Sequence, residues 1–456
     1  MTAFETFLKP GKRGYLIGIG GVSMSPLAEV LAGMGLHISG SDMNESEKVA
    51  YLRSLNIPVN IGHSTGTITP EIEFIVRTAA VHDDNPEIVA AHALGIPVFE
   101  RTQAWGAIMR DYKNAICISG THGKTTTTSM CTHIFMAAEQ DPTVMVGGTL
   151  PLLKAGHRVG QGETIIMESC EYYNSFHSFY PTIAIILNVD ADHLDFFQDL
   201  DDIKRSFRKF AELVPDNGLV VLNADDANTM DAMAGINRPV MTFGLEQPAD
   251  VYAENIRHMG ATTEFDIMHR GTLYAHVGLR VPGIHNVRNA LAAAAAAIFL
   301  GISPNAVKYG LAGFAGTERR FEFKGKFNGA DVYDDYAHHP VELQALIDAV
   351  KPLGYKRTIF VFQPHTYSRT AALFGEFVEQ LRRPDLTFLA EIYAAREQNT
   401  LGISSQDLAR EIPNSMYFPN FDELEKSLKW TASPGDLIIT VGAGDIYKIG
   451  ERLVAE

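Results

Sequence analysis

The residues with the clearest chemical potential lie in the run ICISGTHGKTTTT, residues 116 to 128. This pattern predicts a short apolar strand, a turn with two glycines, and a helix whose first N–H groups can wrap an anion. Lys124 would reach the β- and γ-phosphates of a nucleotide, and the Thr125 hydroxyl would lie on Mg²⁺. An ordinary glycine-rich turn is the alternative, because Ile118 stands where the full pattern has its first glycine. We call residues 120–126 the phosphate loop; its predicted ATP-binding members are Gly120, Thr121, His122, Gly123, Lys124, Thr125 and Thr126.

Acidic residues and a histidine follow two predicted strands beyond this loop. Glu168 ends the first strand, and the second, over 183–188, leads into Asp190, Asp192, His193 and Asp195. Open α/β sheets bind ligands at the carboxyl ends of their strands. Carboxylates beside a histidine can hold the divalent metal that ATP chemistry requires. The alternative, solvated loop charge, is weakened by the phosphate loop in the same region.

A second glycine motif, YLIGIGGVSMS, occupies residues 15 to 25. Gly18, Gly20 and Gly21 follow an apolar run, and Asp42 ends the next predicted strand. This spacing is typical of a dinucleotide fingerprint. Ser23 replaces the usual Gly or Ala at the sixth position, so a pyrophosphate other than that of NAD fits equally well.

Two clusters near the C-terminus also follow predicted strands. The segment VYDDYAHHPVE, residues 332 to 342, crowds two aspartates and two histidines, which is costly without a cation or substrate. In FQPHTYSRT, residues 362 to 370, the guanidinium of Arg369 suits bidentate capture of a carboxylate. The alternatives are structural histidines and a surface arginine.

Composition narrows the class of protein. The net charge of −16 at pH 7 repels phosphate backbones, so we expect no nucleic-acid partner and no stable membrane association. The three cysteines lack a paired metal spacing and favour a reducing compartment. The N-terminal residues lack a signal-peptide pattern, and the most apolar stretch, 290–300, is too short for a bilayer. We expect a cytoplasmic protein.

Short apolar runs alternate with helical patterns along the 456 residues. A buried run followed by a helix is typical of a parallel sheet covered on both faces, so the predicted fold class is α/β. The length suggests about three domains, and the points where a predicted helix ends and a new strand follows give boundaries of 1–113, 114–322 and 323–456. The alanine run 292–297 predicts a close-packed helix. The predicted strands are 15–19, 74–78, 115–119, 164–167, 183–188, 219–223, 331–333, 358–363, 387–390 and 437–441.

In their order along the chain these motifs resemble the Mur ligases of peptidoglycan synthesis. The resemblance rests on GIGGVSMSPLAE, NPEIVAAHALGIPV, SGTHGKTTTT, GIHNVRNALAA, GTERRFE, YDDYAHHPVE, FQPHTYSRT, VGAGDIY and the Glu168 and His193 segments. It implies an N-terminal Rossmann-like domain that binds a UDP-sugar, a central ATPase-type domain and a C-terminal Rossmann-like domain that closes over ATP and amino acid. It implies ATP as co-substrate, two Mg²⁺ ions, and amide formation between L-alanine and the lactyl carboxylate of UDP-N-acetylmuramate. Monomer and homodimer both stay open.

The resemblance also assigns residues to each ligand. Those for the UDP-sugar are Gly18, Gly20, Gly21, Ser23, Ser41 and Asp42. Thr125 and Glu168 would hold the first metal ion, and His193 would hold the second. Those for ATP, beyond the phosphate loop, are Asn286, Asn289, Arg320 and Asp335, and those for alanine are Tyr336, His338, His365 and Arg369. The segment ESCEYY, from Glu168, and Thr366 differ from the residues of many relatives.

The chemistry of such a ligase follows from the carboxylate. An ionised acid forms no amide at neutral pH until phosphorylation supplies a good leaving group, and Mg²⁺ and Lys124 would neutralise the charge on the transferred group. The resemblance adds Arg320 as an arginine that positions the nucleotide phosphate. His338 is the candidate base for the incoming amine, because a histidine near its ordinary pKa is largely neutral at pH 7. Bringing three substrates together predicts a hinge near residues 320–330.

Three other functions compete with this interpretation. An NAD-dependent oxidoreductase would use the N-terminal glycines and Asp42 but leaves the phosphate loop and His193 without a task. A non-catalytic ATP-binding regulator would need no carboxylate acceptor. A recycling ligase would add a ready-made tripeptide to the same sugar nucleotide; YDDYAHHPVE and the Glu168 segment favour the alanine enzyme.

Overall fold

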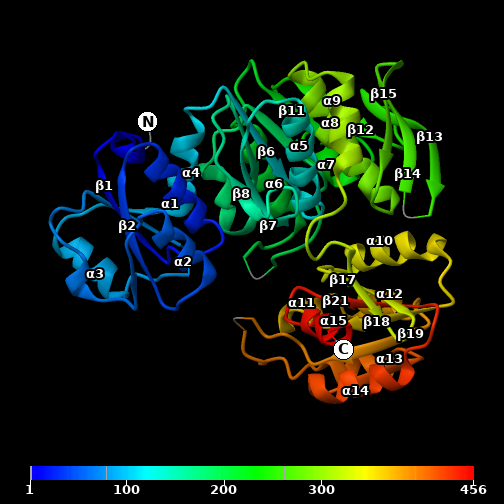
Figure 1. Cartoon of the computed structure of the whole chain (residues 1–456). Coiled ribbons are helices and arrows are strands. Elements are labelled where there is room, and N and C mark those ends of the chain that lie inside the picture. The colour runs from blue at the N-terminus through cyan, green and yellow to red at the C-terminus, as the bar shows by residue number, and fades with distance from the viewer. Residues whose placement is uncertain (1–2, 79, 195, 261, 396, 456) are drawn as a thin grey trace.

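Three β-sheets follow one another along the chain, and each forms the centre of an α/β domain (Figure 1). The computed structural model describes residues 3–78, 80–194, 196–260, 262–395 and 397–455. In Figure 1 the N-terminal domain lies at the left, the central domain at the top and the C-terminal domain below it. The predicted three-domain α/β fold is confirmed, and every predicted strand is present with bounds that shift by at most two residues.

The N-terminal sheet has the order β3-β2-β1-β4-β5, and its paired strands run parallel. Both β1 and β2 end at the same edge, so the glycines after β1 face Asp42 at the end of β2. Its strands are β1 (Arg13–Ile17), β2 (His37–Asp42), β3 (Val59–Ile61), β4 (Phe74–Arg77) and β5 (Val98–Glu100). Its helices are η1 (Ala3–Phe7), α1 (Met24–Gly33), α2 (Glu47–Ser54), η2 (Thr65–Thr67), α3 (Pro86–Ala93) and α4 (Arg101–Met109).

The central sheet has ten strands in the order β15-β14-β13-β12-β11-β10-β6-β9-β7-β8. Its parallel middle carries the phosphate loop between β6 and α5, and the alanine run lies fully buried in α8, as predicted. Its strands are β6 (Asn114–Ser119), β7 (Thr143–Leu150), β8 (Ala155–Arg158), β9 (Thr164–Glu168), β10 (Ile183–Ile186), β11 (Leu219–Asn223), β12 (Val240–Gly244), β13 (Val251–Met259), β14 (Thr262–His269) and β15 (Thr272–Leu279). Its helices are α5 (Lys124–Ala137), η3 (Tyr172–Ser178), α6 (Leu200–Ala211), α7 (Ala227–Ala232), α8 (Ile284–Phe299) and α9 (Pro304–Gly313).

The C-terminal sheet has the order β16-β17-β21-β18-β19-β20 and is parallel except for the β16–β17 hairpin. Strand β16 was absent from the predicted strands; Asn328 and Gly329, both at positive φ, form the two-residue turn that joins it to β17. Its strands are β16 (Glu322–Phe327), β17 (Ala330–Asp335), β18 (Arg357–Phe362), β19 (Leu386–Ala390), β20 (Ser415–Phe418) and β21 (Asp436–Val441). Its helices are α10 (Pro340–Val350), η4 (Lys351–Leu353), α11 (Tyr367–Ala372), α12 (Phe374–Leu381), α13 (Ser405–Glu411), α14 (Phe421–Thr431) and α15 (Tyr447–Val454).

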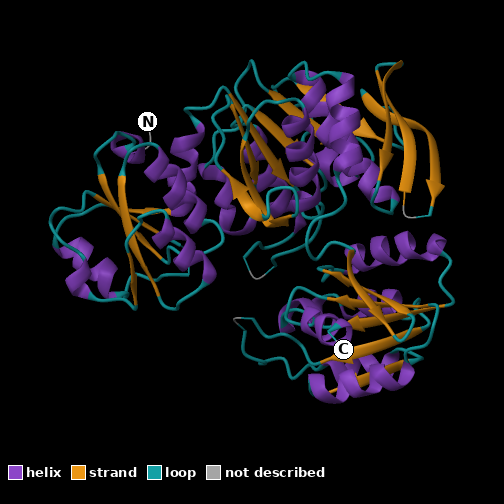
Figure 2. Cartoon of the chain, in the orientation of Figure 1, coloured by secondary structure: helices purple, strands orange, loops and turns teal. Residues whose placement is uncertain are grey.

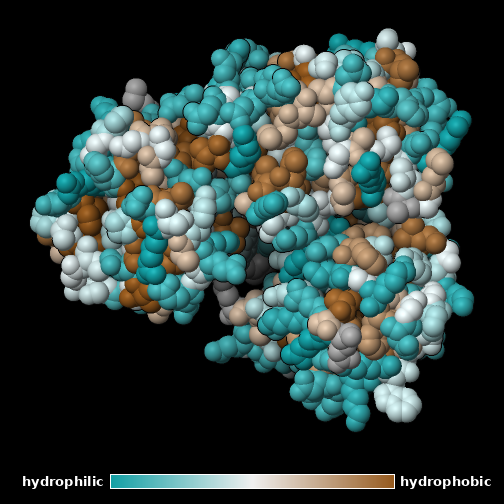
Figure 3. Space-filling model, viewed as in Figure 1, coloured by the Kyte–Doolittle hydropathy of each residue, from teal (hydrophilic) through white to brown (hydrophobic). Residues whose placement is uncertain are grey.

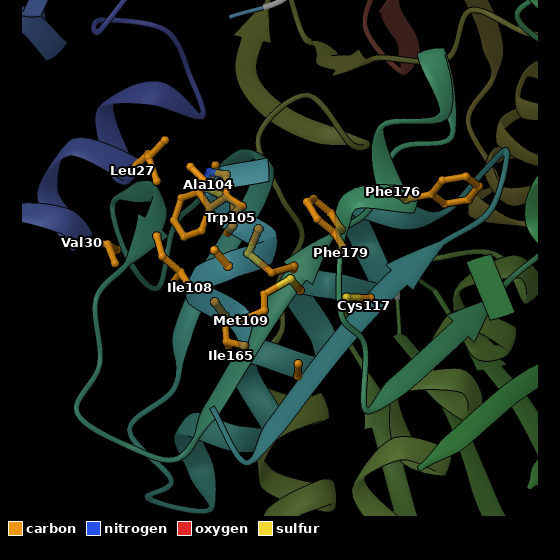
Figure 4. Close-up of a cluster of buried hydrophobic side chains, with 14 of the residues drawn as sticks. Leu27, Val30, Ala104, Trp105, Ile108, Met109, Cys117, Ile165, Phe176 and Phe179 are labelled. Atoms are coloured by element: carbon orange, nitrogen blue, oxygen red, sulfur yellow. The ribbon is translucent and has the colours of Figure 1, made fainter. Parts of the chain in front are cut away.

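The three domains are joined in different ways. One apolar cluster continues from α1 and α4 of the N-terminal domain to Ile165, Phe176 and Phe179 of the central domain, around Trp105 (Figure 4). The C-terminal domain has two apolar clusters of its own, on the two faces of its sheet, and helices cover both faces (Figure 2). The first two domains are therefore fixed to each other by apolar packing, whereas among the described residues no apolar cluster spans the third domain and the central one.

The described part of the chain holds no helix that is both long enough and apolar enough to cross a membrane.

Candidate functional site

The phosphate loop turns sharply because two glycines occupy positions that no other residue fits. Gly120 has φ +145°, and a Cβ there would lie 2.9 Å from Cβ of Leu187. Gly123 has φ +84°, and its Cβ would lie 2.8 Å from Oδ1 of Asn289. The N–H groups of Thr121 and His122 donate to Asn188. Lys124, Thr125 and Thr126 form the first turn of α5, whose N–H groups have no carbonyl partner within the helix and suit a phosphate.

The Lys124 ammonium lies across the mouth of the loop. Its Nζ donates to the carbonyl of Gly120 at 2.6 Å and to the Glu171 carboxylate at 3.0 Å. Burial opposes the charge, but the Glu171 carboxylate outweighs it and holds the pKa of Lys124 above its ordinary value. The lysine therefore stays charged where an incoming phosphate would need a cation.

Two groups predicted to hold metal meet beside Lys124. The Thr125 hydroxyl donates to Oε1 of Glu168 at 3.0 Å, while the N–H of Gly147 donates to Oε2 at 2.7 Å. Such hard oxygen donors suit Mg²⁺. His193 stacks on Tyr172 with ring centroids 4.4 Å apart, and its Nε2 lies 3.9 Å from Glu171. The residues present therefore fit the magnesium ions that ATP chemistry needs; Asp195, also predicted here, lies outside the described residues.

An ion pair brings the C-terminal domain to this site. Nη2 of Arg369 donates to Oδ1 of Asp192 at 2.8 Å, and both side chains are nearly buried. Burial alone would raise the pKa of Asp192, but the Arg369 guanidinium outweighs it and lowers that pKa. Nη1 of Arg369 lies 3.3 Å from Nδ1 of His365, and the His365 and His338 rings are 5.9 Å apart. Three residues predicted to bind alanine thus lie together.

The protonation state of His338 follows from its neighbours. Its Nδ1 lies 3.0 Å from the carbonyl of Tyr336 and 3.3 Å from Oε2 of Glu342, and both oxygens are acceptors. We therefore assign the proton of the neutral ring to Nδ1, which leaves Nε2 as the acceptor. Burial lowers the pKa of His338 to about 4, so the ring is neutral at pH 7.

The predicted asparagines lie beside the phosphate loop. Asn289 donates to Oδ1 of Asn286 at 3.3 Å, and Asn286 donates to the carbonyl of Pro282 at 2.7 Å. Asn289 also lies against Gly123, so it contacts the loop directly. These contacts keep the start of α8 in register with the loop.

Arg320 and Asp335 lie at the junction with the C-terminal domain. The Arg320 guanidinium is 5.1 Å from the ring centroid of Tyr336 and 3.8 Å from Glu342. Both carboxylate oxygens of Asp335 accept backbone N–H groups, from Phe321 and Ala337, each at 2.8 Å. Burial raises the pKa of Asp335 to about 6. In this arrangement Asp335 holds its own strand end in place.

The N-terminal glycine motif lies on a different sheet. The N–H of Gly20 donates to Oδ2 of Asp42 at 2.9 Å, so this carboxylate closes the glycine turn. The backbone carbonyl of Ser41 accepts from Gly18, but its hydroxyl turns away and donates to buried Glu87 at 2.6 Å. Ser23 accepts from the indole of Trp105 through its carbonyl.

Figure 3 shows the molecule hollowed where the three domains face one another.

Family models match most of the chain: "Mur ligase family, catalytic domain" over residues 14–113, "Mur ligase middle domain" over 118–297 and "Mur ligase, glutamate ligase domain" over 319–444.

The chain belongs to the Mur ligase family.

Among Mur ligases the chain is similar to UDP-N-acetylmuramate–L-alanine ligases. Those of Agathobacter rectalis and Lachnospira eligens are 46% and 47% identical over 445 and 447 residues, which cover 96% of this chain and 97% of each relative. The crystal structure of UDP-N-acetylmuramate-alanine ligase from Thermotoga maritima is 30% identical, with a TM-score of 0.80 over 97% of this chain and 98% of that one. A murein peptide ligase from Psychrobacter arcticus, 23% identical with a TM-score of 0.71, covers 98% of both chains and shares the fold.

Several pairings at this Mur ligase site were not predicted from the sequence. Glu171 pairs with Lys124, Asp192, expected beside a metal, pairs with Arg369, and Glu342 lies between His122 and His338. The only local signal was the acidic character of the segments that contain them. Lys124, Arg369 and His122 lie far from these partners in the sequence, so spacing gave no indication of those pairs, whereas Glu342 and His338 are only four residues apart.

Proposed function

We propose that the protein is an ATP-dependent ligase that joins L-alanine to the lactyl carboxylate of UDP-N-acetylmuramate and releases ADP and phosphate. The observation that carries the proposal is the phosphate loop, with charged Lys124, facing an arginine and a neutral histidine from another domain. The names of the relatives at 46% and 47% identity support the same substrates.

The first step would be phosphorylation of the lactyl carboxylate. A carboxylate oxygen attacks the γ-phosphorus of ATP, the bond to the β,γ-bridging oxygen breaks, and an acyl phosphate and ADP form. The first-turn N–H groups of α5 and Lys124 would hold the phosphates, so Lys124 must exchange the Gly120 carbonyl and Glu171 for phosphate oxygens. Stabilising the charge of the transferred group is the main task of such a site.

Magnesium fits the residues beside Lys124. Thr125 and Glu168 would hold one ion and His193 a second. Bound Mg²⁺ supplies positive charge against the phosphate oxygens.

Amide formation would follow beside Arg369 and His338 of the C-terminal domain. Arg369 would bind the carboxylate of alanine, and Tyr336 and His365 would lie beside it. The amine nitrogen attacks the acyl carbon, the carbon–oxygen bond to phosphate breaks, and a proton leaves the nitrogen. Nε2 of His338 is the free acceptor for that proton.

In the N-terminal domain, Gly18, Gly20, Gly21 and Ser23 would bind the pyrophosphate of the sugar nucleotide. Asp42 already holds the turn of these glycines. Ser41 would act through its carbonyl, since its hydroxyl is engaged with Glu87.

Release of phosphate tests the proposal. We expect release only when ATP, L-alanine and UDP-N-acetylmuramate are all present, with one amide formed per phosphate. Release without any acceptor would indicate an ATP-binding regulator, and reaction with a tripeptide but not with L-alanine would indicate the recycling ligase. Hydride transfer with NAD and no phosphate release would indicate the oxidoreductase.

A further inference from the structure

Glu342 stands between the two halves of the proposed site. It occupies the third position of α10, in the C-terminal domain, and its side chain is 12% exposed. Oε1 faces the central domain, 3.4 Å from Nδ1 of His122 in the phosphate loop. Oε2 faces its own domain, where it accepts the backbone N–H of His338 at 3.0 Å and lies 3.3 Å from Nδ1 of the same residue.

The groups around this carboxylate keep it ionised. Burial alone would raise the pKa of Glu342, but His338, His122 and Arg320 outweigh burial and hold the pKa well below its ordinary value. His122 also faces Asp190 at 3.7 Å and stacks on His339 with ring centroids 4.8 Å apart. Burial lowers the pKa of His122, but Asp190 and Glu342 outweigh it and raise the pKa to about 9. The His122 imidazole of the phosphate loop therefore faces a carboxylate of the C-terminal domain.

The contacts of Glu342 differ in kind. Those with His338 lie within the C-terminal domain and persist when that domain moves. The contact with His122 joins two domains that share no apolar cluster among the described residues, so it exists only while they are docked. His122 lies in the phosphate loop, two residues before Lys124. A ligand that fixes this loop therefore favours docking of the domain that carries His338 and Arg369.

We propose that Glu342 is a positioning residue that couples the phosphate loop to the amino-acid site through His122. The inference rests on the proposed function, because it names the ligands of the two sites. A nucleotide that orders the loop would place His122 against Glu342 and so raise the affinity of the docked domain for alanine. By linkage, alanine raises the affinity for nucleotide by the same factor.

The test measures this factor rather than the rate. L-Alanine binding to the full chain, saturated with UDP-N-acetylmuramate and Mg²⁺, is followed by calorimetry with and without a non-hydrolysable ATP analogue. For the natural protein we expect the analogue to tighten alanine binding by about tenfold or more, within the range typical of coupled sites. In Glu342→Gln we expect the factor to fall to about two or less, whereas Glu342→Asp retains part of it.

Matched controls separate coupling from folding. Glu423 occupies the same third position in α14, is exposed, and accepts a hydrogen bond from the side chain of Asn420. Glu423→Gln should therefore keep the full effect of the analogue on alanine binding. If Glu342→Gln fails to fold, His122→Asn reads the same contact from the other domain and should also abolish the factor. Weaker alanine binding by an equal amount with and without the analogue would show a merely structural role and overturn the inference. So would a natural protein that binds both ligands without coupling. A natural protein that binds neither ligand would instead overturn the proposed function.

Discussion

Replacement of Gly120 by alanine tests whether the shape of the phosphate loop depends on that glycine. The new Cβ would lie 2.9 Å from Cβ of Leu187 and 3.2 Å from the backbone nitrogen of Asn188, neither of which belongs to a flexible side-chain end. Strain at φ +145° costs about 1–3 kcal/mol and overpacking about 1–3 kcal/mol, so the free energy of unfolding should fall by about 2–6 kcal/mol. If about 2 kcal/mol is relieved by displacing the loop, nucleotide affinity falls about thirtyfold.

The control is Gly354→Ala. Gly354 has φ +76° but open space around its Cβ position, so it carries the strain without the clash. Denaturant unfolding of both variants, with calorimetric titration of an ATP analogue, separates the two contributions. The reasoning fails if Gly120→Ala unfolds no more easily than Gly354→Ala and binds the analogue as tightly as the natural protein.

Three further predictions concern the C-terminal domain. Arg369→Ala should raise the KM for L-alanine about ten- to hundredfold with little change in the KM for ATP, because a hydrogen bond to a charged group is worth about 1.5–3 kcal/mol. An unchanged KM for L-alanine would show that the amino acid binds elsewhere. Since the pKa of His338 is lowered to about 4, its Nε2 stays unprotonated as the pH falls from 7.5 to 5.5, and the ratio of single-turnover rates of the natural protein and His338→Gln should stay constant over that range. A ratio that drops with a midpoint near 6.5 would refute this. Because no apolar cluster among the described residues joins the C-terminal domain to the central one, X-ray scattering should show a smaller radius of gyration once an ATP analogue and UDP-N-acetylmuramate are added. Superimposable curves would argue against closure.

Most parallel strands with an unbroken buried run were predictable. Strand β10, for example, is an unbroken apolar run with every residue buried. The parallel strands β3, β5, β7, β12 and β20, which are interrupted by exposed or partly exposed residues, were missed. The antiparallel strands β13 to β15 were missed because one face is exposed: in β14 buried and partly buried residues alternate, which gives no apolar run. Strand β16 was missed because Gly325 inside it resembles a break.

The site was predictable where one local motif carries it, as in the phosphate loop or the Asp42 turn. It was not predictable where the contacts join residues that are far apart in the sequence. Asp192 and Arg369 are 177 residues apart, and only the docking of two domains brings them within 2.8 Å. The hydroxyl of Ser41 illustrates the same limit, because its partner Glu87 comes from a distant helix.

The most direct test of the central claim follows oxygen atoms. If the lactyl carboxylate is phosphorylated before the amine attacks, one of its oxygens leaves with the phosphate. With UDP-N-acetylmuramate labelled with ¹⁸O in both carboxylate oxygens, mass spectrometry should find one ¹⁸O in each phosphate released and one in the new amide. Phosphate free of label, with both heavy oxygens elsewhere, would contradict an acyl phosphate and with it the account of how this site works.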